Sequence, residues 1–218
     1  MPGPAAVVFD LDGVLIESER VWDTARKELV RDRGGTWHDD ATTEMMGMSS
    51  KEWSQYLHER LGVPMDSAEI NDAVVQRVAA AFEEHLPLLP RAVETVRELA
   101  TRWPLGVASS SNRPIIELVL ERSDLRACFD AIVSSEEVEH GKPAPDVYIA
   151  AARQLGVAPD DCAAVEDSTN GIKAAVAAGM RTIAVPNREL PPADDVLKMA
   201  AVVVSSLAEV TADLVASL

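Results

Sequence analysis

Short apolar segments that alternate with helical patterns most constrain how this chain of 218 residues can fold. After Pro90, the pattern predicts strands at residues 105–109, 131–134, 162–167, 182–185 and 201–204. Helical periodicity fills the intervals between the first four of them. Strands that are apolar throughout are buried on both faces, as in parallel sheets covered by helices on each side. The sequence therefore predicts an α/β fold, with a Rossmann-like parallel sheet.

A long helical section separates the first apolar segment, near Val7, from all the others. Residues 17–85 contain apolar residues at helical spacing and no convincing strand. Glycines at 34–35 and 62 indicate breaks between helices there. We therefore predict a core domain of residues 1–16 and 86–218, with an all-helical domain of residues 17–85 inserted into it.

The charge of the chain argues against several classes of partner. Lys and Arg number 20 and Asp and Glu number 36, which gives a net charge of −16. An acidic chain without a basic cluster is not expected to bind nucleic acid or a membrane surface. No apolar run approaches the roughly 18 residues of a membrane span, and the chain leads directly into its first strand. We expect a cytoplasmic protein. If its ligand is anionic, the positive charge that binds the ligand must be local.

Chemically active side chains gather at the predicted strand ends. They are Asp10, Asp12, Ser109, Glu166, Asp167 and, in the loop of residues 141–146, Lys142. Because parallel strands end at one edge of a sheet, we expect these groups to converge. Mg²⁺ prefers oxygen ligands, and a phosphate is bound by a cation, a lysine and hydroxyl groups. An aspartate can act as nucleophile, with a second carboxyl group as general acid and base.

Four motifs carry a resemblance to a known family. They lie at residues 10–15, 108–111, 141–146 and 165–172. In this order they resemble the motifs of haloacid dehalogenase superfamily hydrolases, in the phosphatase and β-phosphoglucomutase-like branch. The resemblance covers essentially the whole chain. It implies that the helical insertion is a cap that closes over the site, and that Mg²⁺ is the cofactor.

The resemblance also implies a role for each matching residue. Asp10 resembles the nucleophile that forms an aspartyl-phosphate, and Asp12 resembles the general acid and base. The implied phosphate-binding residues are Ser109, Ser110 and Lys142. The implied metal ligands are Asp10, Asp12 through its backbone carbonyl, Asp167, and Glu166 either directly or through water.

The substrate is expected to be a small phosphorylated metabolite. The leading prediction is Mg²⁺-dependent hydrolysis of a phosphate monoester, such as a sugar phosphate or a phosphoglycolate-like compound, by a monomer or homodimer. Candidate residues for contact with the leaving group are Glu17, Trp22, Met46, Met48, Ser50 and Lys51 from the cap, and Ser111, Asn112 and Arg113 from the core.

Phosphoryl transfer within a sugar, as in β-phosphoglucomutase, is the main alternative reaction. Trp22 stands where a mutase of this branch has a cap histidine, and Ser50 stands where it has a cap arginine. Both differences count against a mutase. Phosphonate hydrolases use a cap lysine, and neither Lys27 nor Lys51 lies in that sequence context.

Two further alternatives share the fold but not the reaction. Dehalogenases lack the second acid of the Asp-x-Asp pair, so Asp12 argues against that activity. A catalytically silent binding protein would be expected to have lost Asp10 or Asp167, and both are present. The test that separates it from an enzyme is hydrolysis of phosphate esters with and without Mg²⁺.

Overall fold

The computed structural model describes residues 3–45, 48–187 and 191–218. Six strands form one parallel sheet, in the order β3-β2-β1-β4-β5-β6. They are β1 (Ala6–Phe9), β2 (Leu105–Ser109), β3 (Ala131–Ser134), β4 (Cys162–Glu166), β5 (Arg181–Ala184) and β6 (Val202–Val203). The predicted α/β fold is confirmed. β6 is shorter than predicted, and Val203 of this edge strand is exposed.

The first strand in the chain lies near the centre of the sheet. Phe9 of β1 is level with Val107 of β2 on one side and with Val165 of β4 on the other. The strand order reverses direction at this point, where open α/β sheets form their binding crevice at the carboxyl ends of the strands. Asp10, the next residue, is therefore placed directly at that crevice.

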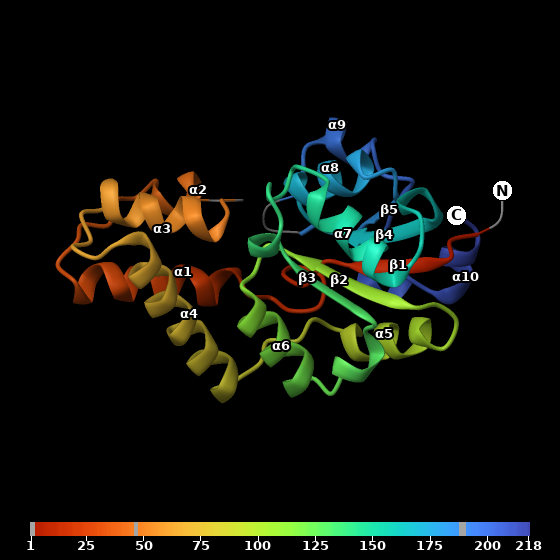
Figure 1. Ribbon diagram of the computed structural model, residues 1–218, viewed down its shortest axis with the longest axis horizontal. Coiled ribbons are helices and arrows are strands. Elements are labelled where there is room, and N and C mark those ends of the chain that lie inside the picture. The colour runs from red at the N-terminus through yellow and green to blue at the C-terminus, as the bar shows by residue number, and fades with distance from the viewer. Residues whose placement is uncertain (1–2, 46–47, 188–190) are drawn as a thin grey trace.

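Helices cover both faces of the sheet (Figure 1). Along β1, Val7 and Phe9 pack into one apolar cluster and Val8 into another on the opposite face, as the alternation of side chains in a strand requires. The first cluster includes residues of α5 (Ala92–Ala100), α6 (Arg113–Arg122) and α10 (Ala212–Ala216). The second includes residues of α7 (Asp146–Leu155) and α8 (Thr169–Ala177), and α9 (Asp194–Leu197) packs beside α8. Short 3-10 turns are η1 (Arg126–Cys128), η2 (Ser135–Glu137), η3 (Pro159–Asp161) and η4 (Leu207–Glu209).

The segment between β1 and α5 forms a group of helices at one end of the molecule (Figure 1). It consists of α1 (Glu19–Asp32), α2 (Ala41–Glu44), α3 (Ser50–Glu59) and α4 (Ser67–Glu84). Capping boxes at Ser49 and Asp66 fix where α3 and α4 begin. Gly34 and Gly62 have φ values of 75° and 72°, which agrees with the predicted helix breaks. Its described residues contain no strand, so the helical character predicted for this insertion is confirmed.

The two ends of the helical insertion lie side by side. Ile16 forms an antiparallel bridge with Leu88. The amide of Glu17 donates to the carbonyl of Pro87 at 2.9 Å, and the amide of Leu89 donates to the carbonyl of Leu15 at 2.9 Å. The chain therefore leaves the sheet and returns to it through two paired segments.

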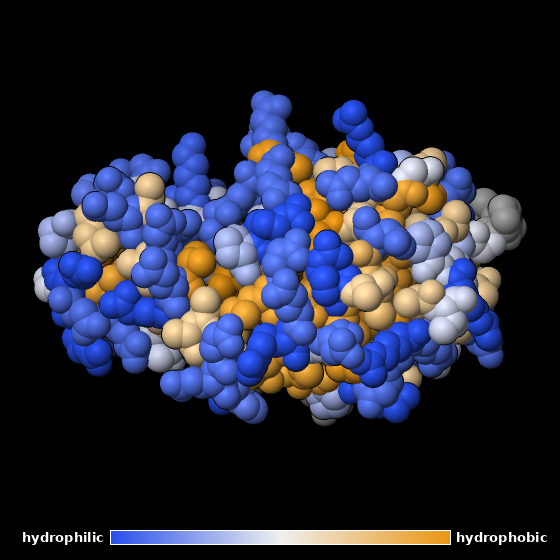
Figure 2. Space-filling model, turned by 60° about the horizontal axis from the view of Figure 1, so that its bottom comes forward, coloured by the Kyte–Doolittle hydropathy of each residue, from blue (hydrophilic) through white to orange (hydrophobic). Residues whose placement is uncertain are grey.

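The surface carries scattered rather than continuous apolar groups. In the face shown in Figure 2, hydrophobic areas are divided by polar side chains. Among the described residues, the large hydrophobic side chains left exposed are Leu88, Ile149, Met199 and Val203. None of the helices in the described ranges combines the length and the apolar character needed to cross a membrane.

Candidate active site

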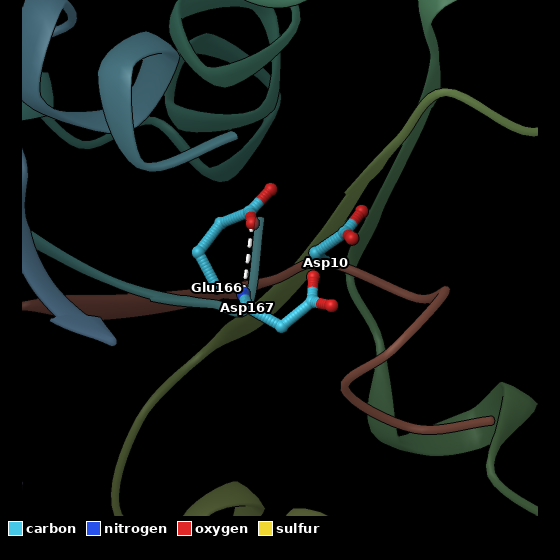
Figure 3. A group of neighbouring side chains, drawn as sticks. All are labelled: Asp10, Glu166 and Asp167. Atoms are coloured by element: carbon cyan, nitrogen blue, oxygen red, sulfur yellow. Dashed lines mark hydrogen bonds between the residues drawn. The ribbon is translucent and has the colours of Figure 1, made fainter. Parts of the chain in front are cut away.

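Three buried carboxylates meet at the carboxyl ends of β1 and β4 (Figure 3). Asp10 follows β1 and donates its amide hydrogen to the carbonyl of Val165 at 2.9 Å, which ties it to the neighbouring strand. Glu166 ends β4, and Asp167 follows it. One oxygen from each of the three side chains lies within 4.8 Å of the others. The sheet itself therefore brings together acids that are more than 150 residues apart in sequence.

Lys142 reaches this cluster from the loop before α7. Its Nζ donates to Asp10 Oδ1 at 2.8 Å and to Glu166 Oε1 at 2.7 Å, and its side chain is only 5% exposed. The hydroxyl of Tyr148 donates to the same Glu166 oxygen at 3.0 Å. One ammonium group thus joins the carboxylates of two adjacent strands.

Glu166 is held by donors on both of its oxygens. Its Oε2 accepts hydrogen bonds from the amides of Asp167 and Ser168, each at 2.9 Å, and from the Ser168 hydroxyl at 3.1 Å. The side chain curls back over its own backbone to do so (Figure 3). Gly171 makes room for it, since a Cβ there would lie 1.5 Å from Glu166 Oε1. Glu166 is therefore placed to orient Lys142 and the first turn of α8.

The cluster contains more negative charge than Lys142 balances. Burial raises the pKa of Asp10 to about 8; Lys142 opposes this shift, and the charges of Glu166 and Asp12 add to it. Burial, followed by the charges of Glu166 and Asp10, raises the pKa of Asp167 well above its ordinary value. Burial alone would lower the pKa of Lys142, but Asp10 and Glu166 raise it above its ordinary value. The site therefore favours an additional positive charge.

Asp167 has a free oxygen that suits a metal ion. Its Oδ1 is buried and has no hydrogen-bond partner among the described residues. Gly13, with φ of 79°, permits the approach of this side chain, because a Cβ there would lie 2.0 Å from Asp167 Oδ2. Carboxylate oxygens are the ligands that hard divalent cations prefer. The residues present therefore fit a divalent cation held between Asp10 and Asp167.

Asp12 is surrounded by serine hydroxyl groups. Its Oδ1 accepts a hydrogen bond from Ser18, and its Oδ2 accepts from Ser111 at 2.7 Å and from Ser109 at 3.2 Å. Ser109 is fully buried and also accepts a hydrogen bond from the amide of Ser111 at 2.9 Å. The structure thus places Ser109 behind Asp12, where it fixes a carboxylate and a turn.

A pocket of about 490 Å³ opens in front of these groups, between the sheet edge and the helical insertion. Its volume lies in the range of ordinary small-molecule sites. The predicted site residues that line it are Asp10, Asp12, Glu17, Trp22, Met48, Ser50, Ser110, Ser111, Asn112, Lys142 and Asp167. Met46 lies outside the described residues.

Four of the predicted residues do not line the pocket: Ser109, Glu166, Lys51 and Arg113. Ser109 and Glu166 lie behind the residues that do. Lys51 is exposed on α3. The Arg113 guanidinium makes two hydrogen bonds of 2.6 Å to Glu137 and a third of 2.6 Å to the carbonyl of Ile132. Arg113 thus ties the start of α6 to the end of β3, and the structure does not place it where a leaving group would bind.

Asn112 joins the core to the helical insertion. Its Nδ2 donates to Asn71 of α4 at 3.2 Å and to Glu136 at 2.6 Å. Its Oδ1 accepts a hydrogen bond from Ser50 of α3 at 3.4 Å. Both ends of its amide are therefore engaged, although Asn112 lies at the pocket wall as predicted.

Sequence reasoning missed part of the lining. The missed residues are Gly13, Ser18, Glu19, Asp23, Arg26, Thr42, Met45, Trp53, Ser168, Thr169, Asn170 and Asn187. Arg26 was open to detection, since it lies four residues after Trp22 and therefore on the same face of a helix. Trp53 was not, because only the packing of α3 beside α1 brings it to Trp22, with ring centroids 6.2 Å apart.

A buried cluster of carboxylates with one lysine, at the carboxyl edge of a parallel sheet and beneath a helical insertion, defines an α/β enzyme with a carboxylate-based site. The family model described as haloacid dehalogenase-like hydrolase matches residues 4–179. The chain belongs to this family.

The relatives agree with this assignment. Hexitol phosphatase B of Escherichia coli K12 is 38% identical, over 95% of this chain and 94% of that protein. Fructose-1-phosphate phosphatase YqaB of the same strain is 30% identical, over 83% of this chain and 96% of that protein. CbbY from Rhodobacter sphaeroides, solved in complex with phosphate, has a TM-score of 0.86 and 30% identity, over 99% of this chain and 100% of that one. The predictions of family, fold and a hydrolase that acts on phosphate monoesters are confirmed.

Proposed function

We propose that this protein is a Mg²⁺-dependent phosphatase that hydrolyses a small sugar phosphate or phosphoglycolate-like ester through an aspartyl-phosphate on Asp10. The observation that carries the proposal is the buried Asp10 carboxylate, bonded to Lys142 and adjacent to the free oxygen of Asp167. The names of the relatives support it, since two of them are phosphatases of hexitol phosphates and of fructose 1-phosphate.

Asp10 is the nucleophile of this reaction. A carboxylate oxygen forms a bond to phosphorus while the bond from phosphorus to the leaving alcohol breaks. Lys142 favours the ionised form of Asp10, against the effect of burial, and offsets the charge on the phosphoryl oxygens. A water molecule then attacks phosphorus, which releases inorganic phosphate and restores the Asp10 carboxylate.

Asp12 moves the protons in both steps. It gives a proton to the oxygen of the leaving alcohol, and it later takes one from the attacking water. Ser18, Ser109 and Ser111 hold its carboxyl group at the pocket wall. Hydrogen bonds from these hydroxyls keep the side chain in place between the two transfers.

Mg²⁺ would be held by Asp10 and Asp167, together with the backbone carbonyl of Asp12. When bound, the ion supplies positive charge that offsets the negative charge of the phosphate and of the acids around it. Glu166 supports the site from behind, because both of its oxygens already accept hydrogen bonds from protein donors.

Residues 17–85 act as a cap on a core of residues 1–16 and 86–218. The pocket is lined from both parts, by Trp22 and Ser50 on one side and by Lys142 and Asp167 on the other. The cap shields the phosphate from bulk solvent and selects the leaving group. Trp22 fills the place in which a mutase of this branch has its histidine, and this favours transfer to water over transfer within a sugar.

The test is the release of inorganic phosphate from a panel of sugar phosphates, polyol phosphates and 2-phosphoglycolate, with Mg²⁺ and with a chelator. Hydrolysis that requires Mg²⁺ and is lost in Asp10→Asn is expected. The matched control is Asp130→Asn, which alters an exposed aspartate outside the pocket and is expected to leave the rate unchanged. Conversion of a sugar 1-phosphate to its 6-phosphate without phosphate release would indicate a mutase. Metal-bound protein that is inactive on the whole panel would indicate a silent binding protein.

A further inference from the structure

Arg26 is the second basic side chain in the pocket and has no part in the proposed chemistry. It lies on α1 of the cap and lines the same cavity as Asp10 and Lys142. Its guanidinium carbon is 5.5 Å from the ring centroid of Trp22 and 4.9 Å from that of Trp53. The two indoles restrict the movement of the guanidinium group.

One donor of the Arg26 guanidinium group, Nε, lacks the partner that a buried donor needs. This nitrogen is buried without a hydrogen-bond partner among the residues that the structure describes. A buried donor left unsatisfied destabilises the protein, and more so when the group is charged. Burial lowers the pKa of Arg26 to about 10, so the group still carries its charge at neutral pH.

Acidic side chains whose charges act on Arg26 are Asp23, Asp12 and Glu19. Asp23 accepts hydrogen bonds from Lys27 at 2.6 Å and from Thr42 at 2.7 Å. Asp12 accepts hydrogen bonds from three serines. These two carboxylates thus have other donors, and the protein leaves the Arg26 Nε without an acceptor.

We propose that Arg26 is a specificity-determining residue that binds an anionic group, a carboxylate or a second phosphate, on the leaving-group part of the substrate. This inference rests on the proposed phosphatase function and names the substrate class. The planar guanidinium matches two oxygens of such a group. The esterified phosphate at Asp10 and the second anion at Arg26 then occupy one cavity.

The test compares pairs of esters that differ by the second anion. 2-Phosphoglycolate is paired with 2-hydroxyethyl phosphate, and fructose 1,6-bisphosphate with fructose 1-phosphate. The wild-type kcat/KM is expected to be roughly 10- to 100-fold higher for the anionic member of one pair, as for a charge-assisted hydrogen bond. The pair that shows the preference distinguishes a carboxylate from a second phosphate.

Arg26→Met is expected to reduce this preference to about onefold, and Arg26→Lys is expected to restore part of it. The control is Arg31→Met on the same helix, which removes a guanidinium whose side chain is 72% exposed and is expected to keep the wild-type ratio. If the wild-type enzyme shows a preference in neither pair, the proposal is overturned. Equal losses for both members of each pair in Arg26→Met would also overturn it, since these would show that Arg26 only supports the packing of Trp22 and Trp53.

Binding to Asp10→Asn protein separates this inference from the proposed reaction. Calorimetric titration of the Asp10→Asn protein with the same four esters measures their affinities without any turnover. Tighter binding of an anionic member, lost in the Asp10→Asn/Arg26→Met double variant, would support the subsite even if no ester is hydrolysed. Equal affinities within both pairs would contradict it, while hydrolysis of all four esters would leave the phosphatase function intact.

Discussion

At the scale of residues, the proposed mechanism separates groups that react from groups that position them. Asp10, Asp12 and Asp167 face the pocket. Glu166 lies behind them and directs Lys142. The Asp-x-Asp pair was predictable because two charges at the end of an apolar strand are unusual without a use. The hydrogen bonds to both Glu166 oxygens were not predictable, since they depend on the folded turn that follows β4.

Glu166→Gln is expected to lower kcat by at least tenfold while leaving the Mg²⁺ concentration for half-maximal activity nearly unchanged. The side-chain NH2 group of the glutamine would face either the ammonium group of Lys142 or the amide donors of the α8 turn. Two donors cannot form a hydrogen bond with each other, so Lys142 would lose its position. Asp167→Asn is expected instead to raise the Mg²⁺ requirement. Titration of activity with Mg²⁺ checks both variants, and a raised requirement in Glu166→Gln would instead make Glu166 a metal ligand.

Asp12→Asn is expected to lower kcat by roughly 10²–10⁴-fold on alkyl phosphates, the usual range for loss of a general acid and base. On an aryl phosphate the loss in the first step is expected to be smaller, because a good leaving group needs little protonation. Burst kinetics with an aryl phosphate measures that step separately. An equal loss in the first step for both kinds of ester would argue against Asp12 as the proton donor.

At the scale of elements, close approaches of backbone and side chain fix the site. The first turn of α8 passes so near Glu166 that only glycine fits at position 171. The buried face of α1, with Trp22, Ala25, Leu29 and Val30, was predictable from its spacing. The position of Arg113 was not predictable. This residue follows β2, whereas its partner Glu137 follows β3, and only the folded sheet brings the two together.

Gly171→Ala is expected to destabilise the fold by about 1–3 kcal/mol or more, although alanine favours helices in general. Its methyl group would displace Glu166 and thereby Lys142, so activity is expected to fall with stability. Urea unfolding and phosphate release measure the two effects. Lys173→Ala, an exposed change in the same helix, is the control that is expected to alter neither.

The whole molecule is strongly acidic, and two of its positive side chains line the pocket. Lys142 belongs to the core and Arg26 to the helical insertion, and both line one cavity. The division into sheet and insertion was predictable from the change in periodicity. The full set of residues that line the pocket was not predictable. It depends on how the insertion packs against the sheet domain, through contacts such as the hydrogen bond from Asn112 to Asn71.

The stability of the metal-free protein is expected to fall as the pH rises from about 4 to about 8. Asp10 has an ordinary pKa of 3.8, and burial raises its pKa to about 8 in the folded protein. The protonated carboxyl group of Asp10 therefore contributes fully to folding stability below a pH of 3.8, and this contribution is lost as the pH rises to about 8. Under the proposed function Mg²⁺ would bind the ionised Asp10, so it is expected to raise Tm more at pH 8 than at pH 5. Thermal unfolding in chelator and in Mg²⁺ checks this, and a pH-independent Mg²⁺ effect would contradict it.

The paired segments at the two ends of the helical insertion make this part of the protein exchangeable. Because Ile16 and Leu88 are already bridged, a short linker can join them with little loop-closure entropy. Insertions of other lengths can be grafted at the same place without altering the register of the sheet. If residues 17–85 select the substrate, as we propose, replacing this one contiguous segment would change the substrate range while Asp10 and Asp12 remain as they are.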